Sequence, residues 1–378
     1  MTAPRLEVDL EKIFQNTSVL VTSLRARNIS VTGVTKAFMG EPRLARALLA
    51  AGVMGIGDSR IENIEAMRAA GITAPMTLIR SPMQSQVDRV VEHADISFNT
   101  ELDVLNALSI AARKTRKRHG VVLMVEMGDL REGIMPEDLE QFVRAARHIP
   151  NIDLIGIGTN LACQNGVSPD SEKMSELSHL AEFLETTFGF VLEIVTGGNS
   201  SNIQGSLSGG EKDRINNLRL GEAILLGLDP LSRQPIEGLF TNAISLVAEV
   251  IEAKAKPLAP WGNIGQSAFG KSPVSEREGN AFQTILALGR QDIDPDGLTG
   301  APEIKVLGAS SDHLIVETGS RRLAVGSEIT FKLNYSALLR AVTSPFITKT
   351  YSLPKTRRIP ENSEVCTHRT AEELHKWP

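Results

Sequence analysis

The fold of this chain is constrained most by a regular alternation of apolar, β-branched runs with amphipathic helical segments, which extends to about residue 230. This alternation is typical of βα units arranged around a parallel sheet. Eight such units fit a closed (β/α)8 barrel of the TIM type, and an open doubly wound sheet also accommodates them. The pattern predicts strands near residues 31–38, 54–57, 76–79, 95–98, 121–127, 154–159, 192–196 and 218–225, and helices that include 61–70, 86–93, 102–117, 136–147 and 171–188.

The pattern changes after Pro230. Short strand-like segments are separated by turns rich in Gly, Asp and Pro, and no long helical pattern lies between them. We therefore expect an α/β chain with a barrel at residues 10–230, followed by a smaller, mainly β C-terminal domain at 231–352. Residues 1–9 are expected to add an N-terminal strand to the β domain, and residues 353–378 to form a polar tail. The strands of the β domain are expected near residues 244–253, 283–288, 304–306, 314–317, 328–332 and 346–351.

Composition excludes several classes of protein. A hydrophobic content of 42% and a charged content of 22% are ordinary for a globular chain, and a net charge of -5 argues against nucleic-acid binding. The only cysteines, Cys163 and Cys366, provide neither a disulfide framework nor the spacing of metal ligands. No apolar run reaches the length of a membrane span, and the first residues do not resemble a signal peptide, so we expect a cytoplasmic protein.

Lys36 is the most informative single residue, because it lies in the otherwise apolar segment 31–38. An ammonium group is rarely buried in a strand without a partner. At the C-terminal end of the first barrel strand it would face the catalytic mouth, where a desolvated lysine has a lowered pKa and forms Schiff bases with aldehydes. The alternative is a lysine at the rim whose ammonium reaches water.

Two further turns predict a phosphate site. Residues 195–203 place small and hydroxylic residues after the seventh strand, and residues 218–222 place Arg219 beside a tight turn after the eighth. Barrels frequently bind phosphate at the loops after these two strands. Together with Lys36, the turns predict a site for pyridoxal 5'-phosphate (PLP). The lysine would bind the aldehyde, the turns would bind the phosphate, and the arginine would contact the ring nitrogen.

From residue 5 to residue 351 the chain resembles the barrel-fold, PLP-dependent amino-acid racemases of the alanine racemase type, and within them the alanine/ornithine racemase group. The resemblance lies in the ordered series of motifs and not in any one of them. These are Val-Thr-Lys-Ala at 34–37, Met-Gly-Asp-Leu-Arg-Glu-Gly at 127–133, Gly-Gly-Asn-Ser at 197–200, Leu-Arg-Leu-Gly at 218–221, Ser-Asp-His at 311–313 and Leu-Asn-Tyr at 333–335.

The resemblance implies a role for each matching residue. Lys36 matches the Schiff-base lysine, which also acts as acid and base on one face of the substrate α-carbon. Arg219 matches the arginine at the pyridine nitrogen, and Arg131 matches the one near the phenolic oxygen and the substrate carboxylate. The remaining cofactor contacts would come from Asn160, Ser200, Ser201, Gly221, Glu222 and Tyr335.

Each role has a structural alternative. Arg219 could instead pair with Glu222 or Asp213, and Arg131 with Asp129 or Glu132. Tyr335 could be a core aromatic of the β domain. Asp312 matches an acidic residue that the family supplies from the partner subunit, which implies a head-to-tail homodimer with shared active sites.

The chain also departs from the family pattern. The second catalytic base of the family is a tyrosine, expected here within residues 265–270, but that segment contains Phe269 and no tyrosine. Ser267, Lys271 and His313 are nearby hydrogen-bonding residues that could replace it. Met124 and Asn160 occupy the places of the family's supporting lysine and ring-stacking histidine, which argues against strict specificity for alanine.

Cys163 has two interpretations. It could be a proton donor near the turn at 158–163, but a small buried hydrophobic residue is the favoured interpretation, because free cysteines are usually buried.

These features predict a racemase that interconverts the L and D forms of a free amino acid, with a basic one such as ornithine as the favoured substrate. Asp129 and Asp312 could receive the side-chain ammonium of such a substrate. A decarboxylase or aldolase on the same scaffold is an alternative, because barrels support many chemistries. A non-catalytic PLP-binding carrier or regulator is another, because the family tyrosine is missing.

Overall fold

The computed structural model describes residues 2–208, 214–270 and 278–352, and its N-terminal part is a closed barrel of eight parallel strands. The first and last strands pair with each other, with Thr32 opposite Arg219, and this pairing excludes the open sheet. The predicted fold class is confirmed. The strands are β2 (Ser30–Val34), β3 (Gly55–Asp58), β4 (Met76–Leu78), β5 (Ile96–Asn99), β6 (His119–Met124), β7 (Ile152–Gly158), β8 (Ile194–Thr196) and β9 (Asn217–Leu220).

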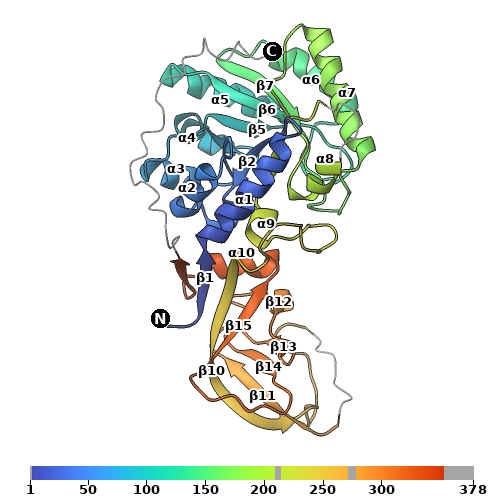
Figure 1. The fold of residues 1–378 in the computed structure, drawn as a ribbon. Coiled ribbons are helices and arrows are strands. Elements are labelled where there is room, and N and C mark those ends of the chain that lie inside the picture. Colours follow the sequence, from blue (N-terminus) through green and yellow to red (C-terminus); the bar gives the residue numbers. More distant parts are fainter. Residues whose placement is uncertain (1, 209–213, 271–277, 353–378) are drawn as a thin grey trace.

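Helices surround the barrel (Figure 1). Their buried apolar residues belong to the same hydrophobic core as those of the strands. Helix α1 (Leu10–Arg25), which was not among the expected helices, begins at Asp9. The carboxylate of Asp9 accepts hydrogen bonds from the backbone N–H groups of Glu11 and Lys12, both at 3.1 Å. The others are α2 (Pro42–Ala50), α3 (Ile61–Ala69), α4 (Val87–His93), α5 (Leu102–Thr115), α6 (Leu139–Ala146), α7 (Ser171–Phe188), α8 (Ile203–Ser208) and α9 (Glu222–Leu226).

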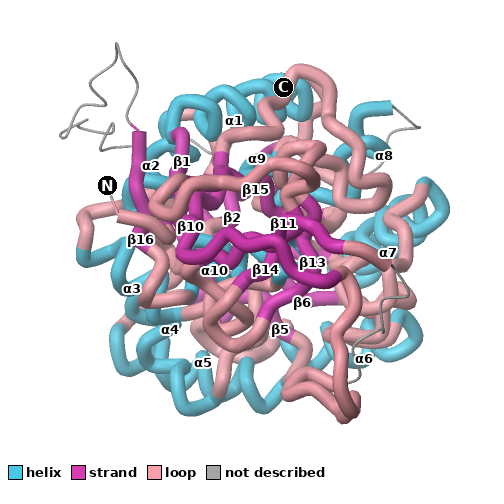
Figure 2. The backbone as a smooth tube through the Cα atoms, turned by 90° about the horizontal axis from the view of Figure 1, so that it is seen from below, coloured by secondary structure: helices cyan, strands magenta, loops and turns pink. Residues whose placement is uncertain are grey.

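The C-terminal part is a mainly antiparallel sheet with the strand order β12-β15-β10-β11-β14-β13. Strand β1 (Arg5–Asp9) pairs with β10 and β16 and then continues directly into α1, so it joins the two parts of the molecule. Seen from below, the sheet lies over the centre of the ring of helices (Figure 2). Its strands are β10 (Ile244–Pro257), β11 (Asn280–Leu286), β12 (Leu298–Thr299), β13 (Lys305–Ala309), β14 (Leu314–Glu317), β15 (Glu328–Leu333) and β16 (Thr348–Ser352).

One helix, α10 (Tyr335–Thr343), interrupts the β domain, where no long helix was expected, so that expectation was wrong. The side chain of Asn334 accepts a hydrogen bond from the N–H of Ala337 at 2.9 Å and caps the helix. Its buried residues, which include Leu338 and Ala341, have helical spacing. The helix contacts the short 3-10 turn that contains Lys36, so the β domain faces the mouth of the barrel.

Two predicted strands were too long. The first ends at Val34, and Lys36 lies in a 3-10 turn (Lys36–Phe38) and not in the strand. The eighth ends at Leu220, and the apolar residues after Gly221 form α9. A short apolar run is compatible with a strand or a buried helix, so periodicity alone did not separate them.

Two absences apply to the described ranges only. No helix there is both long enough and apolar enough to cross a membrane. No group of three or more His, Cys, Asp or Glu side chains in those ranges is arranged to hold a metal ion.

Candidate active site

The turn that carries Lys36 is fixed by Asp58, the last residue of β3. The hydroxyl of Thr35 donates a hydrogen bond to the Asp58 carboxylate at 2.8 Å. This carboxylate also accepts from the N–H of Arg60 at 3.0 Å and from the side chain of Asn63 at 2.9 Å. Asp58 is completely buried, and burial raises its pKa. The network ties the residue before Lys36 to the neighbouring strand, so the lysine has a fixed origin at the mouth of the barrel.

Lys36 enters a pocket that also contains most of the residues predicted for the cofactor. The pocket lies between the C-terminal ends of the barrel strands and the first turn of α10. The predicted residues that line it are Lys36, Asn160, Ser200, Arg219, Gly221, Glu222 and Tyr335.

Three predicted residues do not line this pocket. Ser201 is next to Ser200 and is 4% exposed. Arg131 lies on the loop after β6, and Asp312 is exposed on the turn between β13 and β14. The roles predicted for Arg131, Ser201 and Asp312 stay predictions.

Arg219 is a buried cation whose hydrogen-bond partners are neutral. Its guanidinium donates to the Thr196 hydroxyl at 2.6 Å, to the Thr159 carbonyl at 2.9 Å and to Asn160 Oδ1 at 3.2 Å. Burial, reinforced by the charge of Arg131, lowers its pKa to about 10, so it stays protonated near neutral pH. A buried charge without a carboxylate partner favours a ligand that accepts hydrogen bonds.

One of the two alternative ion pairs of Arg219 is not formed. Glu222 pairs instead with Arg233, whose guanidinium donates to the carboxylate at 2.6 Å. The other alternative partner, Asp213, lies outside the described residues.

The pKa of Lys36 is lowered, mainly by burial. The positive charges of Arg131 and Arg219 lower it further, whereas a thiolate at Cys163 and the charge of Asp58 act in the opposite direction. A lysine with a lowered pKa more often has the free amine that attacks an aldehyde. The electrostatics therefore fit a nucleophilic lysine and argue against the rim alternative.

The turn at Ser200 follows β8, leads into α8 and is hydrogen-bonded to the residues after β9. Asn199 accepts a hydrogen bond from the N–H of Ser201 at 2.8 Å. The Ser200 hydroxyl accepts from the N–H of Gly221 at 3.3 Å and from that of Ala223 at 3.2 Å. A Cβ at Gly221 would lie 3.2 Å from the Cβ of Val34, so a larger residue would disturb the strand that leads to Lys36.

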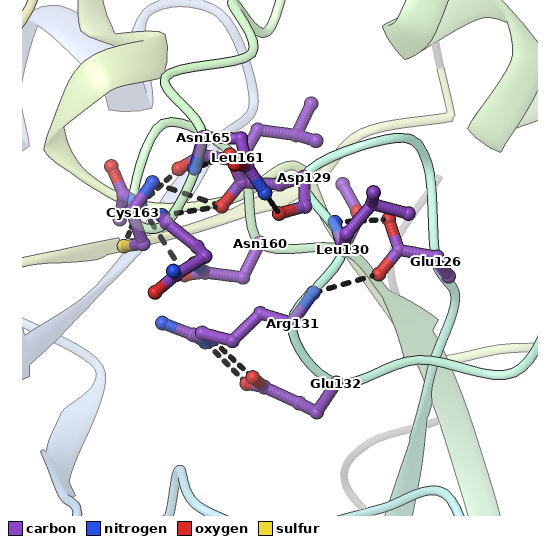
Figure 3. A network of polar contacts seen from close by, with 12 residues as sticks. Glu126, Asp129, Leu130, Arg131, Glu132, Asn160, Leu161, Cys163 and Asn165 are labelled. Carbon is purple, nitrogen blue, oxygen red and sulfur yellow. Dashed lines mark hydrogen bonds and ion pairs between the residues drawn. The ribbon is translucent and has the colours of Figure 1, made fainter.

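Two loops at the open side of the pocket are held by carboxylates (Figure 3). Glu126 accepts hydrogen bonds from the N–H groups of Gly128, Leu130 and Arg131. The Asp129 carboxylate accepts hydrogen bonds from backbone N–H groups of the segment that begins at Cys163. The donors are Cys163, Gln164, Asn165 and Val167.

Because the Asp129 carboxylate is occupied in this way and 1% exposed, the prediction that it receives a substrate ammonium was wrong. The guanidinium of Arg131 pairs with Glu132, one of its two predicted alternatives.

Buried polar atoms without partners identify where a ligand would fit. Within the described residues, the buried side-chain N and O atoms that lack a hydrogen bond belong to Ser81, Asn99, Asn160, Ser201, Asn202 and Thr284. All except Thr284 lie at or just after the C-terminal end of a barrel strand. Native chains rarely leave such atoms unsatisfied, so the barrel mouth fits a polar ligand.

The structure corrects the interpretation of Cys163. It was expected to be a small buried hydrophobic residue, but it is exposed and lines the pocket with Lys36. The backbone segment that begins at Cys163 is hydrogen-bonded to the Asp129 carboxylate, and this keeps Cys163 at the surface. Sequence patterns do not reveal such a contact.

Two residues considered as a replacement for the family tyrosine, Ser267 and His313, do not line this pocket. Phe269 is 53% exposed under the guanidinium of Arg290. The Ser267 hydroxyl donates to the Gly270 carbonyl at 2.6 Å, and the His313 ring lies 2.8 Å from the Asp312 carboxylate. Lys271 lies outside the described residues.

Some site residues were missed by sequence reasoning. Asn199 donates to the carbonyl of Leu161 at 2.8 Å, to Asn160 Oδ1 at 3.3 Å and to Cys163 Sγ at 3.4 Å, so it joins the two sides of the pocket. Its place in the Gly-Gly-Asn-Ser turn was a usable signal. The sequence signal for Asp58 was weaker, because it was only an acidic residue at the end of an apolar strand.

Comparison with known proteins agrees with this architecture. Residues 8–230 match the family model described as alanine racemase, N-terminal domain. The chain belongs to this family, and the family predicted from the sequence is confirmed.

Three relatives illustrate the likeness. The lysine racemase of Thermotoga maritima is 38% identical over 93% of this chain and 99% of that protein. The ornithine racemase of Acetoanaerobium sticklandii is 37% identical over 92% of this chain and 99% of that protein. The alanine racemase structure from Streptomyces coelicolor has a TM-score of 0.72 at 20% identity, covers 92% of this chain and 97% of its own, and shows a shared fold.

Proposed function

We propose that this protein is a PLP-dependent racemase that interconverts the L and D forms of a basic amino acid, lysine or ornithine. The observation that carries the proposal is the pocket in which Lys36, with a pKa lowered by burial, meets the buried Arg219 and the Ser200 turn. The lysine and ornithine racemases among its relatives, similar over nearly their whole length, support the same reaction.

The residues at the barrel mouth fit the cofactor. Lys36 would hold its aldehyde carbon, and Arg219 would face its ring nitrogen. The orphaned buried atoms of Asn160 and Ser201 are the kind of groups that a polar ligand would satisfy. Bound PLP supplies an electron-withdrawing ring, which acidifies the α-hydrogen of an attached amino acid. The phosphate would lie against Ser200, Ser201, Gly221, Glu222 and Tyr335.

The chain itself orients the substrate and moves the proton. Lys36 Nζ would take the α-proton from one face of the substrate and return it, because its lowered pKa makes the amine available as a base. Arg131, which is partly exposed beside the pocket, would pair with the substrate carboxylate after leaving Glu132. A guanidinium at the ring nitrogen keeps that nitrogen unprotonated, which favours return of the proton over transamination.

We also propose a head-to-tail homodimer in which Asp312 of the partner subunit completes the entrance. Asp312 lies on a turn of the β domain and is exposed, and its pairing with His313 lowers its pKa. A carboxylate there would attract the side-chain ammonium of a basic substrate. It does not line the pocket of its own subunit.

A chiral assay tests the reaction. The protein is incubated with PLP and separately with L-lysine, L-ornithine or L-alanine, and the products are resolved by chiral chromatography. We expect D-lysine or D-ornithine to form faster than D-alanine. A diamine product would show a decarboxylase instead, and bound cofactor without any turnover would show a carrier.

Mixing two variants tests the shared sites. Lys36→Ala and Asp312→Asn subunits are dissociated, mixed and allowed to reassociate. If each site combines residues from two subunits, a heterodimer contains one intact site, and activity reappears. If both residues serve the same subunit, both sites of the heterodimer are defective and the mixture stays inactive.

A further inference from the structure

We propose that Cys163 is the second acid/base of the reaction and exchanges the α-proton on the substrate face opposite Lys36. The inference rests on the proposed racemase function and assigns one residue of the same site. A racemase that uses two groups needs one proton-exchanging side chain on each side of the α-carbon, and Lys36 supplies only one of them.

The topology places the two residues on different sides of the pocket. Lys36 follows β2, and Cys163 lies in the loop after β7. In the closed ring, β7 is reached from β2 in three steps through β9 and β8, and no strand of an eight-stranded ring is more than four steps away. Both side chains line the same pocket, and they reach it from strands that are three places apart in the ring.

The loop holds the thiol in one place. The N–H of Cys163 donates to the Asp129 carboxylate at 3.0 Å, and that of Gln164 donates to it at 2.8 Å (Figure 3). From the other side, Asn199 Nδ2 donates to Cys163 Sγ at 3.4 Å. This contact fixes the direction of the sulfur atom relative to the turn at Asn199. Asn199 also contacts Asn160, which is bound to the buried Arg219, so the thiol is connected to the predicted cofactor contacts.

The charges around the thiol suit proton exchange. Cys163 is close enough for its charge to affect the pKa of Lys36, Arg219 and Tyr335, which line the pocket, and that of Arg131 on the loop after β6. Three of these four groups are cationic, so the thiol lies among positively charged side chains. Proximity to Lys36 and the Asn199 contact are independent of each other, so the assignment does not depend on the cysteine alone.

The other groups considered are less suitable. Phe269 has no exchangeable proton, the Ser267 hydroxyl donates to the Gly270 carbonyl, and the His313 ring contacts the Asp312 carboxylate. Glu222 is paired with Arg233. Burial raises the pKa of Tyr335, and the family resemblance places this residue at the phosphate.

The proton balance is simple. Lys36 Nζ takes the α-proton on one face, so the C–H bond breaks and its electron pair stays with the substrate. The Cys163 Sγ–H bond then breaks, and its proton forms the new C–H bond on the opposite face. The enzyme is left with a protonated amine and a thiolate, and proton exchange with water restores the starting pair. In the opposite direction the thiolate is the base and the ammonium is the acid.

The test uses Cys163→Ala and Cys163→Ser, with Cys366→Ser as the matched control that removes the only other thiol of the chain. Each variant is loaded with PLP, and its visible absorbance is recorded to show that the cofactor is attached. Racemisation is measured with lysine or ornithine, and α-hydrogen exchange of each pure enantiomer is followed by NMR in D2O.

We expect both Cys163 variants to keep the cofactor absorbance and to racemise at least about 100-fold more slowly, which is a common contribution of a positioned acid or base. One enantiomer should still exchange its α-hydrogen with retention through Lys36, whereas exchange of the other should fall by a similar factor. A purely structural role would slow both enantiomers equally. Equal slowing, or racemisation within about 3-fold of the unmodified protein, would overturn the proposal.

Alkylation provides a readout that does not use turnover. On the Cys366→Ser background, iodoacetamide should label Cys163 of the PLP-loaded protein, and saturating substrate should slow the labelling at least about 10-fold. If substrate did not change the rate of labelling, the result would count against contact between the Cys163 thiol and the substrate. The unmodified protein separates the two proposals, because its failure to racemise would reject the function itself, whatever the variants do.

Discussion

The two ends of the barrel differ in how well their buried polar groups are hydrogen-bonded. Near the N-terminal ends of the strands, such groups find partners within the chain. His119 Nε2 lies 2.8 Å from the Ser97 hydroxyl, and the side chain of Asn217 donates to the hydroxyls of Ser30 at 3.0 Å and Thr32 at 3.2 Å. These groups support the fold, and the closed end has no need of a ligand.

At the mouth, several equally buried atoms have no partner. Asn160 Nδ2 and Ser201 Oγ are examples among the described residues, and the cationic Lys36 and Arg219 line the same pocket as Asn160. Unsatisfied buried polar atoms are rare in native chains, and they gather at functional sites. The closed end therefore contributes stability, and the mouth is suited to bind a ligand. Each prediction below tests this difference between the two ends.

The largest effect is expected at the mouth, from Lys36→Ala. This change removes the proposed attachment point and one acid/base, so racemisation should fall about 10⁴-fold and the visible absorbance of the loaded protein should disappear. The melting temperature of the cofactor-free protein should stay the same or rise, because a buried amine is removed. Borohydride reduction followed by peptide mass mapping checks the attachment.

Lys114→Ala, at an exposed lysine paired with Asp88 on the helical surface, is the control for this change and should leave all three measurements unaltered. Cofactor found on another lysine after borohydride treatment would refute the assignment of Lys36.

The closed end should show its effect in stability and pH. Burial lowers the pKa of His119 to about 4 from an ordinary value of 6.5. The unfolded chain therefore binds a proton below about pH 6.5 and the folded chain only below about pH 4. Between these values the unfolded state holds more protons, so stability falls as the pH is lowered and levels off below about 4. The difference corresponds to about 3 kcal/mol.

His119→Gln keeps a hydrogen-bonding side chain without the titration. Urea unfolding at several pH values should show that the variant lacks this loss between pH 6.5 and 4, whereas its activity near neutral pH stays within about 3-fold of the unmodified protein. A parallel decline of both proteins with pH would remove His119 as the cause.

A smaller effect is expected from Asp129→Asn, at the loop that carries Cys163. Burial alone would raise the pKa of Asp129, but the hydrogen bonds that its carboxylate accepts from backbone N–H groups hold this pKa below the ordinary value. An amide has only one accepting oxygen, so some of these hydrogen bonds should be lost, at about 2 kcal/mol. Hydrogen exchange of residues 163–167 should accelerate. Asp170→Asn, where asparagine still caps α7, is the control and should have little effect.

Much of this division could be predicted from the sequence, because the barrel depends on local patterns. Alternating strands and helices indicated the barrel, and small residues after the seventh and eighth strands indicated the Ser200 and Arg219 turns. The exposed Cys163 could not be predicted, since the Asp129 carboxylate that holds its loop lies 34 residues earlier in the chain. Helix α10 was missed because its apolar residues were interpreted as part of a region dominated by strands.

The smallest effect, and the most direct test of the comparison, comes from one matched pair of serine substitutions. Ser97→Ala at the closed end removes a hydroxyl that contacts His119 at 2.8 Å and accepts from Asn99 at 2.9 Å. It should lower the free energy of unfolding by about 1 kcal/mol. Ser201→Ala at the mouth removes a buried hydroxyl oxygen without a partner, so it should raise the free energy of unfolding of the cofactor-free protein by about 1 kcal/mol.

Urea unfolding of the two cofactor-free variants measures both changes, and titration with PLP measures binding. Ser201→Ala should weaken PLP binding by roughly 10-fold, because the orphaned hydroxyl is proposed to meet the phosphate, whereas Ser97→Ala should leave binding unchanged. Opposite signs in stability together with an effect on binding only at the mouth would sharpen the division between the two ends. If Ser201→Ala destabilised the protein as much as Ser97→Ala, its hydroxyl would have a structural partner, and the mouth would be no less satisfied than the closed end.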